Sequence, residues 1–191
     1  FTGMLPAEIG MLTNLKLLSA VSNELTGMLP VNIGALTKLV TLRLGDNHLS
    51  GTLPEALGLM RTLAFLDLSH QLPDKEKDRG GFTGTLPTFS KMEGLRRLDL
   101  SYNALTGTIS SDFLGGAGGV FEYADLSGNQ LSGSIPAEMT GLELYLQDNF
   151  ISDIKDYCDG GGASGRPSQY GCNEILCPPN TYNQFGRQES D

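Results

Sequence analysis

One pattern of leucines, an asparagine, a glycine and a proline recurs along this chain of 191 residues and limits what it can fold into. The pattern is most complete between Leu39 and Thr62, where the sequence reads LVTLRLGDNHLSGTLPEALGLMRT. Alternation within TLRLG directs Leu42 and Leu44 to one side of a short strand. The side-chain amide of Asn47 can bond backbone groups that the following turn leaves unpaired. Because one unit cannot bury its leucines alone, consecutive units must stack on one another.

The second half of the unit carries the motif Gly-x-[aliphatic]-Pro. Gly51 permits a backbone conformation that a Cβ atom would disfavour. Pro54 fixes its own φ and can begin a short helical turn, with Glu55 at the positive end of that turn. Each unit is therefore expected to run from a strand, through a turn around the asparagine and glycine, into a short helical segment.

The spacing of the units identifies the repeat. Successive units are offset by 24, 24, 32, 26 and 20 residues, with first positions at Leu15, Leu39, Leu63, Leu95, Phe121 and Gly141. The pattern resembles the leucine-rich repeat, and the tail Ser50–Pro54 resembles the plant-type subclass of receptor-kinase ectodomains and polygalacturonase-inhibiting proteins. The resemblance implies an α/β fold, a right-handed leucine-rich-repeat solenoid with a parallel β-sheet on its concave face and short helical or 3-10 turns on its convex face.

We expect the chain to divide into two regions. Residues 1–154 form the solenoid, which starts in the middle of a repeat because Phe1–Pro6 matches Leu49–Pro54; we therefore expect the chain to be a fragment of a longer protein. Residues 155–191 form a cysteine-containing C-terminal cap that covers the last turn and the open edge of the sheet. Within this cap, the run from Gly171 to Asn183 resembles the C-terminal flank of leucine-rich-repeat proteins of algal (diatom) type.

The unit that starts at Leu63, with the longest spacing of 32 residues, contains an insertion. Residues 72–81, LPDKEKDRGG, carry six charged side chains and cannot bury themselves. Phe82 then occupies the next leucine place, so we expect the loop to project from the solenoid without interrupting the core. Closing such a loop costs little, about 0.6 kcal/mol per doubling of length. Two interpretations stay open: a tolerated insertion, which we favour, and a binding loop.

Composition excludes some classes of partner. The net charge is −9 and no basic stripe is present, which argues against a nucleic-acid partner and against docking on anionic lipid. No apolar run approaches the roughly 20 residues that cross a bilayer. We therefore expect no nucleic acid and no membrane insertion within this sequence, while attachment to a membrane-anchored remainder is left open.

The residues that carry chemistry are few. The three cysteines all lie in the tail, which indicates an oxidising compartment and a disulfide. We expect Cys158 to pair with Cys172, with Cys177 as the alternative or pairing beyond Asp191. Neither zinc spacing nor a Ser-His-Asp arrangement is present, and His48 and His70 are expected on the surface. The sequence thus predicts no cofactor, no metal and no enzyme activity.

The outward residues of the predicted strands are the candidate ligand contacts, since the concave face is the usual binding surface of the fold that the pattern resembles. Exposed aromatic residues beside arginines are enriched in binding hot spots. The aspartates belong to Asp-Leu-Ser motifs, which recur in three units and are common in the family. An alternative is that the aromatic residues only pack on one another. The predicted partner-binding residues are Arg43, Phe65, Asp67, Arg97, Asp99, Tyr123, Asp125 and Tyr145.

These features favour a recognition module. We expect a secreted or cell-surface protein of receptor-like or adhesion type that binds a protein, peptide or glycan on its concave face. Two alternatives remain: an inhibitor of an extracellular hydrolase, by resemblance to the polygalacturonase-inhibiting proteins, and a structural protein without a ligand. Fold alone does not decide between them.

Overall fold

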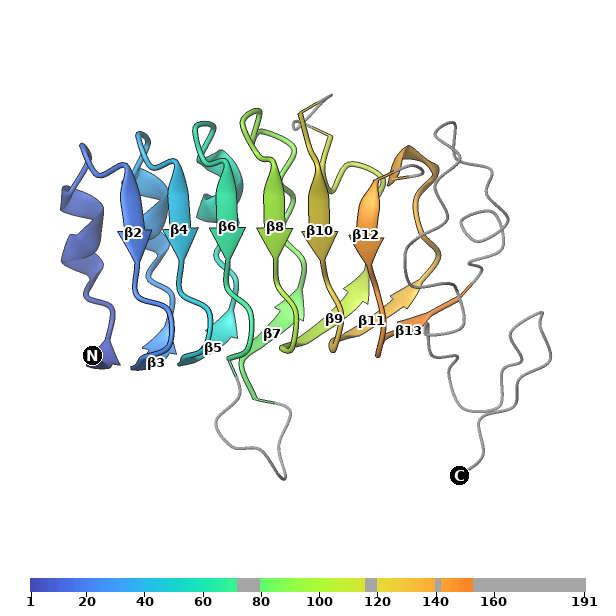
Figure 1. Ribbon diagram of the computed structural model, residues 1–191, viewed down its shortest axis with the longest axis horizontal. Helices are drawn as coiled ribbons and strands as arrows, with labels where there is room; N and C mark the ends of the chain where they lie inside the picture. The colour runs from blue at the N-terminus through green and yellow to red at the C-terminus, as the bar shows by residue number, and fades with distance from the viewer. Residues whose placement is uncertain (72–79, 116–119, 140–141, 153–191) are drawn as a thin grey trace.

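The computed structural model describes residues 1–71, 80–115, 120–139 and 142–152. In this part of the chain, strands alternate between two parallel sheets, so that each repeat adds one strand to each sheet (Figure 1). The first sheet has six strands: β2 (Leu17–Ser19), β4 (Thr41–Arg43), β6 (Phe65–Asp67), β8 (Arg97–Asp99), β10 (Tyr123–Asp125) and β12 (Glu143–Tyr145). This arrangement confirms the predicted solenoid and its concave parallel sheet.

The second sheet, which has seven strands in the described residues, was not predicted. Its strands are β1 (Thr2–Met4), β3 (Glu24–Met28), β5 (His48–Thr52), β7 (Phe82–Thr85), β9 (Ala104–Thr108), β11 (Gln130–Gly133) and β13 (Phe150–Ile151). Sequence analysis placed the residues around Gly51 in a turn, whereas they form the end of β5, with φ of +81° at Gly51. A glycine can take this positive φ inside a strand where other residues are strained.

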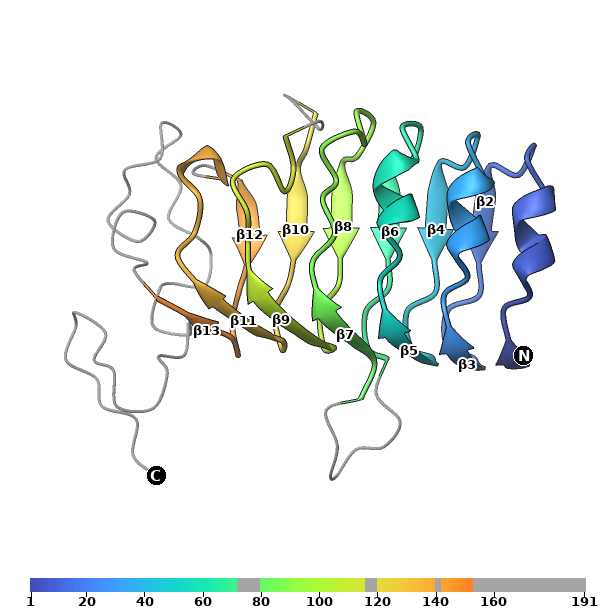
Figure 2. The same ribbon diagram turned by 180° about the vertical axis from the view of Figure 1, so that it is seen from behind.

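Short 3-10 helices lie on the far side of the first sheet, as Figure 2 shows. They follow prolines, as predicted for Pro54. The backbone at Pro54 is extended, with ψ of 134°, and the helix begins at the next residue. The described residues directly after Pro87, and those directly after Ser110, which replaces the proline, form turns or irregular structure instead of a helix. None of the helices in the described ranges is long and apolar enough to cross a membrane. The helices are η1 (Ala7–Met11), η2 (Val31–Ala35), η3 (Glu55–Leu59) and η4 (Ala137–Met139).

The core lies between the two sheets and the helical side. Leu42, Leu44 and Leu49 are fully buried, and burying each such side chain stabilises the fold by about 1.5–3 kcal/mol. Phe82 is also fully buried and pairs with Gly51 of the preceding repeat. The core register therefore resumes after the insertion, as predicted.

A ladder of buried amides links neighbouring repeats. Asn47 donates from Nδ2 to the carbonyls of Leu44 (3.0 Å) and Ala20 (2.9 Å), and its Oδ1 accepts the N–H of Leu25 at 3.0 Å. Gln71 takes the same place in the next repeat and accepts the N–H of Leu49 at 3.0 Å. These bonds satisfy backbone groups that the turn removes from the sheets, which confirms the role predicted for the asparagine position.

Some predictions fall outside the described residues. They concern the cap at residues 155–191 with Cys158, Cys172 and Cys177, the run resembling the diatom flank, and residues 72–79 of the insertion.

Candidate binding surface

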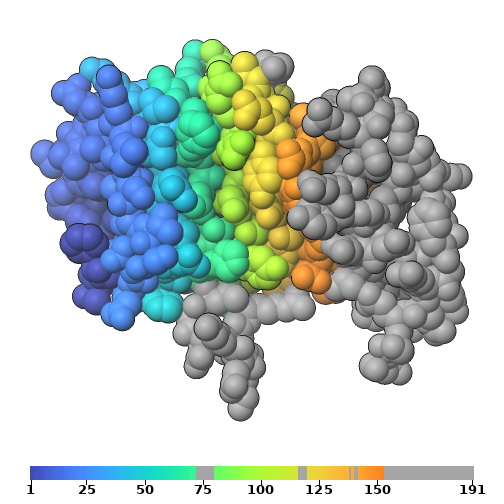
Figure 3. Space-filling model, in the orientation of Figure 1, coloured from blue at the N-terminus to red at the C-terminus, as the bar shows by residue number. Residues whose placement is uncertain are grey.

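The outward side of the first sheet brings most of the predicted partner-binding residues into adjacent columns. Phe65 and Tyr123 each pair in register with Arg97 on the strand between them. The next outward column holds the other predicted residues, in the order Arg43, Asp67, Asp99, Asp125 and Tyr145. Successive repeats lie side by side across this face, as the bands of colour in Figure 3 show.

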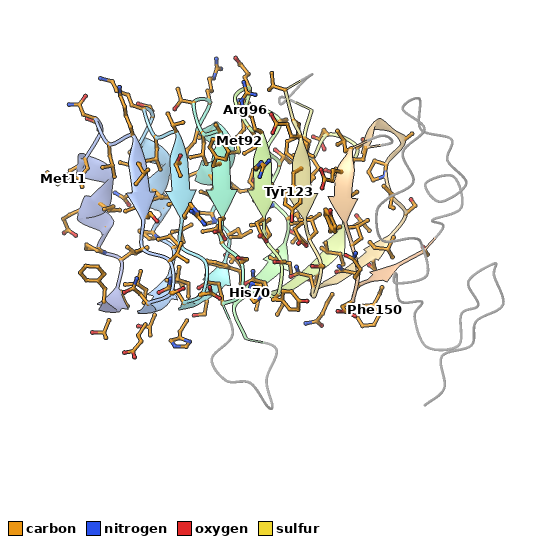
Figure 4. All side chains as sticks on the ribbon, in the orientation of Figure 1. Met11, His70, Met92, Arg96, Tyr123 and Phe150 are labelled. Atoms are coloured by element: carbon orange, nitrogen blue, oxygen red, sulfur yellow. The ribbon has the colours of Figure 1, made fainter. Side chains whose placement is uncertain are left out.

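The aromatic side chains are only partly available. The rings of Tyr123 and Tyr145 lie 5.2 Å apart with an interplanar angle of 46°, and both side chains are half-buried. Arg97 places its guanidinium carbon 6.0 Å from the Tyr123 ring centroid, at the outer limit of a cation–π contact. Phe65 remains 39% exposed. The two tyrosines thus pack on each other, and Figure 4 labels Tyr123 on the first sheet. Phe65 and Arg97 are exposed.

Ion pairs hold the arginines in place. Arg43 Nε lies 3.5 Å from Asp67 Oδ2. Glu122 accepts a hydrogen bond from Arg96 Nη1 at 3.2 Å and forms an ion pair with Arg97, whose Nε lies 3.7 Å from Glu122 Oε2. Sequence analysis missed Glu122, although its place directly before Tyr123 was a signal. Exposed pairs of this kind contribute only about 0–1 kcal/mol, so a ligand can replace them.

The three Asp-Leu-Ser motifs form the same structure. Asp99 Oδ1 accepts the Ser101 hydroxyl at 2.7 Å and the Ser101 N–H at 3.0 Å. Asp125 binds Ser127 in the same way, at 2.6 Å and 2.9 Å. The aspartates are therefore fixed by their own strands, and together they make this column acidic.

Burial and nearby negative charges raise the pKa of two groups on this face, Asp99 and Tyr123. Burial raises the pKa of Asp99 above its ordinary value, the bonds from Ser101 oppose that rise, and the charges of Asp125 and Asp67 add to it. The pKa of Tyr123 is raised as well, by burial first and then by the charges of Asp125 and Asp99. The protonated Tyr123 hydroxyl donates a hydrogen bond to Asp125 Oδ2 at 3.2 Å.

Among the described residues, Asp67, Ser69 and His70 do not form a catalytic relay. Ser69 donates its hydroxyl to Asp67 at 2.7 Å, while the ring of His70 stacks on Tyr102 at 4.4 Å. His70 therefore does not stand between Ser69 and Asp67, as a nucleophile–base–acid relay would require. No cluster of three or more His, Cys, Asp or Glu suited to a metal ion occurs in the described ranges.

A second repetitive surface lies on the outward side of the second sheet. Ser-Gly-Thr at residues 50–52 recurs as Thr-Gly-Thr at 83–85 and at 106–108. The outward residues form what we call the hydroxyl row: Ser50, Thr52, Thr83, Thr85, Thr106, Thr108 and Ser132. Sequence analysis missed this surface, although the repeated tripeptide was the signal that could have revealed it.

Comparison with known families identifies the repeat. The family model described as Leucine Rich Repeat matches residues 38–60, 94–115 and 121–142. These three segments begin within a residue of units assigned from sequence at Leu39, Leu95 and Phe121. Comparison with curated proteins gives no match.

Solved structures with this fold include two receptor ectodomains and one further plant protein. The Arabidopsis receptor kinase HAESA, solved with the peptide hormone IDA and the co-receptor SERK1, is 30% identical with a TM-score of 0.73; the match covers 93% of this chain and 30% of that chain. The ectodomain of GASSHO1/SCHENGEN3 from Arabidopsis thaliana, solved with CASPARIAN STRIP INTEGRITY FACTOR 2, is 30% identical with a TM-score of 0.69, covering 78% of this chain and 17% of that chain.

The third structure is a plant ice-binding protein. It is 31% identical with a TM-score of 0.67, and the match covers 82% of this chain and 49% of that chain. This chain thus spans half or less of the length of all three structures.

Proposed function

Because this chain is a leucine-rich-repeat protein, we propose that it acts as an extracellular recognition module that binds a peptide or protein ligand along its first sheet. The observation that carries this proposal is the group of Phe65, Arg97 and Tyr123 on three adjacent strands. Parallel strands lie about 4.8 Å apart, so the group extends about 10 Å across the sheet. The similarity to receptor ectodomains solved with peptide ligands supports the same assignment.

The residue types on this face suit peptide recognition. Aromatic and arginine side chains dominate binding energy in protein interfaces. Arg97 and Glu122 form an exposed pair, and each partner can exchange it for a ligand group without leaving a buried charge unpaired. The acidic column formed by Asp67, Asp99 and Asp125 lies beside them and favours a ligand with a cationic side chain or N-terminus.

The proposal includes an extracellular location and no catalytic role. The described part of the first sheet binds its own serines to its own aspartates, which gives binding contacts and no activated nucleophile. An extracellular location is supported by the similarity to receptor ectodomains and by the three cysteines grouped in the tail. A disulfide between Cys158 and Cys172 stays a prediction, and intact mass with and without reductant checks it.

The test uses a random peptide library displayed on phage and selected on the folded chain. A selected peptide is then titrated into the variant Phe65→Ala/Arg97→Ala/Tyr123→Ala. We expect lost binding with little change in melting temperature, because the replaced side chains lie on the outward face. The matched control is Thr85→Lys/Thr108→Lys on the second sheet, which should bind the peptide as the unaltered chain does. Unchanged binding by the triple variant would contradict the proposed surface.

A second candidate function is binding to ice. One observation favours it: the hydroxyl row repeats small hydroxyl-bearing side chains on neighbouring strands of a regular sheet. The similarity to a plant ice-binding protein at 31% identity supports the same candidate. The test is the partition of the labelled chain between growing ice and the remaining solution, and exclusion from the ice would reject this function.

A further inference from the structure

We propose that the hydroxyl row of the second sheet is an ice-binding surface, separate from the peptide-binding face of the first sheet; this inference rests on the second candidate function. The row is continuous across four strands. The register places Thr52 beside Thr83, Thr85 beside Thr106 and Thr108 beside Ser132. Neighbours across strands are about 4.8 Å apart and neighbours along a strand about 6.6 Å apart. The hydroxyls therefore recur in two directions, as water oxygens do on a face of ice.

The first hydroxyl on each strand has a fixed direction. Thr83 Oγ1 donates to the Gly51 carbonyl at 3.4 Å, and Thr106 Oγ1 donates to the Gly84 carbonyl at 3.3 Å. Ser132 repeats the bond to the next carbonyl along the sheet at 3.4 Å. Each acceptor belongs to the strand before, so the side chains are ordered by the backbone of the neighbouring repeat.

The second threonine on each strand is fixed by its methyl group. A Cβ atom at Gly107 would lie 2.9 Å from Thr85 Cγ2, and one at Gly133 would lie 2.9 Å from Thr108 Cγ2. The methyl groups therefore occupy space that only a glycine leaves open. Because threonine is also stiff at χ1, the row is ordered before binding and loses little side-chain freedom when it meets a solid surface.

The hydroxyl row carries almost no charge, unlike the rest of the molecule. The chain has a net charge of −9, but His48 is the only ionisable residue among the outward positions of β5, β7, β9 and β11. A neutral strip of hydroxyl and methyl groups complements the neutral lattice of ice. It lacks the exposed aromatic rings on which a polysaccharide would stack and the arginine and tyrosine residues that dominate protein interfaces.

The test measures adsorption of the labelled 191-residue chain to polycrystalline ice. The variant Thr85→Lys/Thr108→Lys puts two long charged side chains on the row. Methionines occupy the equivalent places at Met4 and Met28, with Cγ of each against the next glycine, so an unbranched side chain fits without loss of the fold. Circular dichroism and the melting temperature check this. We expect the unaltered chain to be enriched in ice and the variant to lose that enrichment.

The triple variant Phe65→Ala/Arg97→Ala/Tyr123→Ala is the control and should stay enriched in ice. If the unaltered chain and Thr85→Lys/Thr108→Lys adsorb equally, ice binding stands but its assignment to the hydroxyl row is overturned. If the unaltered chain is excluded from ice, the second candidate function fails. Binding to crystalline cellulose that Thr85→Lys/Thr108→Lys abolishes, with no ice adsorption, would assign the row to a polysaccharide and overturn the proposal.

Discussion

The two sheets are built from the same repeats but differ in how their strands pair and in how much their outward residues vary. In the first sheet, strands pair without offset, Leu42 beside Leu66, and the outward residues differ from one strand to the next. In the second sheet, each strand is shifted by two residues, so that Gly51 pairs with Phe82 of the next repeat, and the outward residues from β5 to β11 are mostly serine and threonine. The second sheet ties its side chains to glycines and carbonyls of its neighbours. In the first sheet the aspartates bond to serines of their own strands, while Phe65 and Arg97 stay exposed and available to a ligand.

The largest predicted effect comes from an amide that joins the two sheets. Asn129 Oδ1 accepts the N–H of Leu105 at 3.0 Å, and Nδ2 donates to the carbonyls of Leu100 and Leu126 at 2.9 and 3.0 Å. Asn129→Ala leaves the buried N–H of Leu105 unpaired, at about 1–3 kcal/mol. The carbonyls of Leu100 and Leu126 keep their bonds from Asn103 and Asn149, so each loses one of two bonds, at about 0.5–1.5 kcal/mol. We expect the free energy of unfolding to fall by about 3 kcal/mol or more, measured by urea denaturation.

The control for this prediction is Asn14→Ala. Asn14 is exposed and accepts a bond only from Lys38 Nζ among the contacts described, at 2.7 Å. Its replacement should change the free energy of unfolding by less than about 0.5 kcal/mol. Equal effects of the two substitutions would show that the amide ladder does not hold the sheets together.

The next effect is confined to the second sheet. Gly107 has φ of +84°, and an added Cβ would lie 2.9 Å from Thr85 Cγ2. Gly107→Ala should lower the free energy of unfolding by about 1–2 kcal/mol for the backbone conformation, with a further loss for the methyl contact. Urea denaturation measures the total.

Thr85→Ser removes that methyl group and so separates the two contributions. The double variant Gly107→Ala/Thr85→Ser should recover the contact loss and keep the backbone loss, in a double-mutant cycle. Gly115→Ala is the control, since its nearest neighbour atom to an added Cβ lies 3.5 Å away. If Thr85→Ser restores nothing, the methyl groups of the row are not held by the glycines.

The smallest effect concerns the acidic column of the first sheet. The raised pKa of Asp99 means that the folded state binds a proton more readily than the unfolded state above about pH 4. The contribution of Asp99 to the free energy of unfolding should therefore fall as the pH rises from about 4 through the raised pKa of Asp99. Asp99→Asn removes the titration and can keep the bonds from Ser101. We expect the unaltered chain to lose stability relative to this variant as the pH rises, measured by urea denaturation at stepped pH. A relative gain would contradict burial as the main influence on Asp99.

Sequence predicted the parts of the fold that a single repeat determines. The spacing of Leu42, Leu44 and Asn47 gave the strand, its inward side and the amide ladder, and the phase of Phe82 gave the continuation of the core. The second sheet was missed because its strands pair with an offset of two residues between repeats. One repeat read alone shows only a glycine that resembles a turn.

The positions of the candidate site residues were predicted from the sequence, but the contacts between their side chains were not. Register alone placed Phe65, Arg97 and Tyr123 on neighbouring strands. The ring contact between Tyr123 and Tyr145 and the pairing of Arg97 with Glu122 depend on rotamers, which the pattern of the sequence does not specify. The Asp-Leu-Ser motif was visible in the sequence. Its hydrogen bonds were not predicted, because they depend on the backbone conformation that brings the serine N–H and hydroxyl to the aspartate.

The most direct test of the peptide-binding surface is photo-crosslinking. A benzoyl-phenylalanine is introduced in place of Phe65 on the first sheet or, in a second protein, in place of Thr85 on the second sheet, and each is irradiated with a peptide selected on the unaltered chain. We predict that the peptide crosslinks from position 65 and not from position 85. Crosslinking from position 85 with none from position 65 would contradict the assignment of ligand binding to the first sheet.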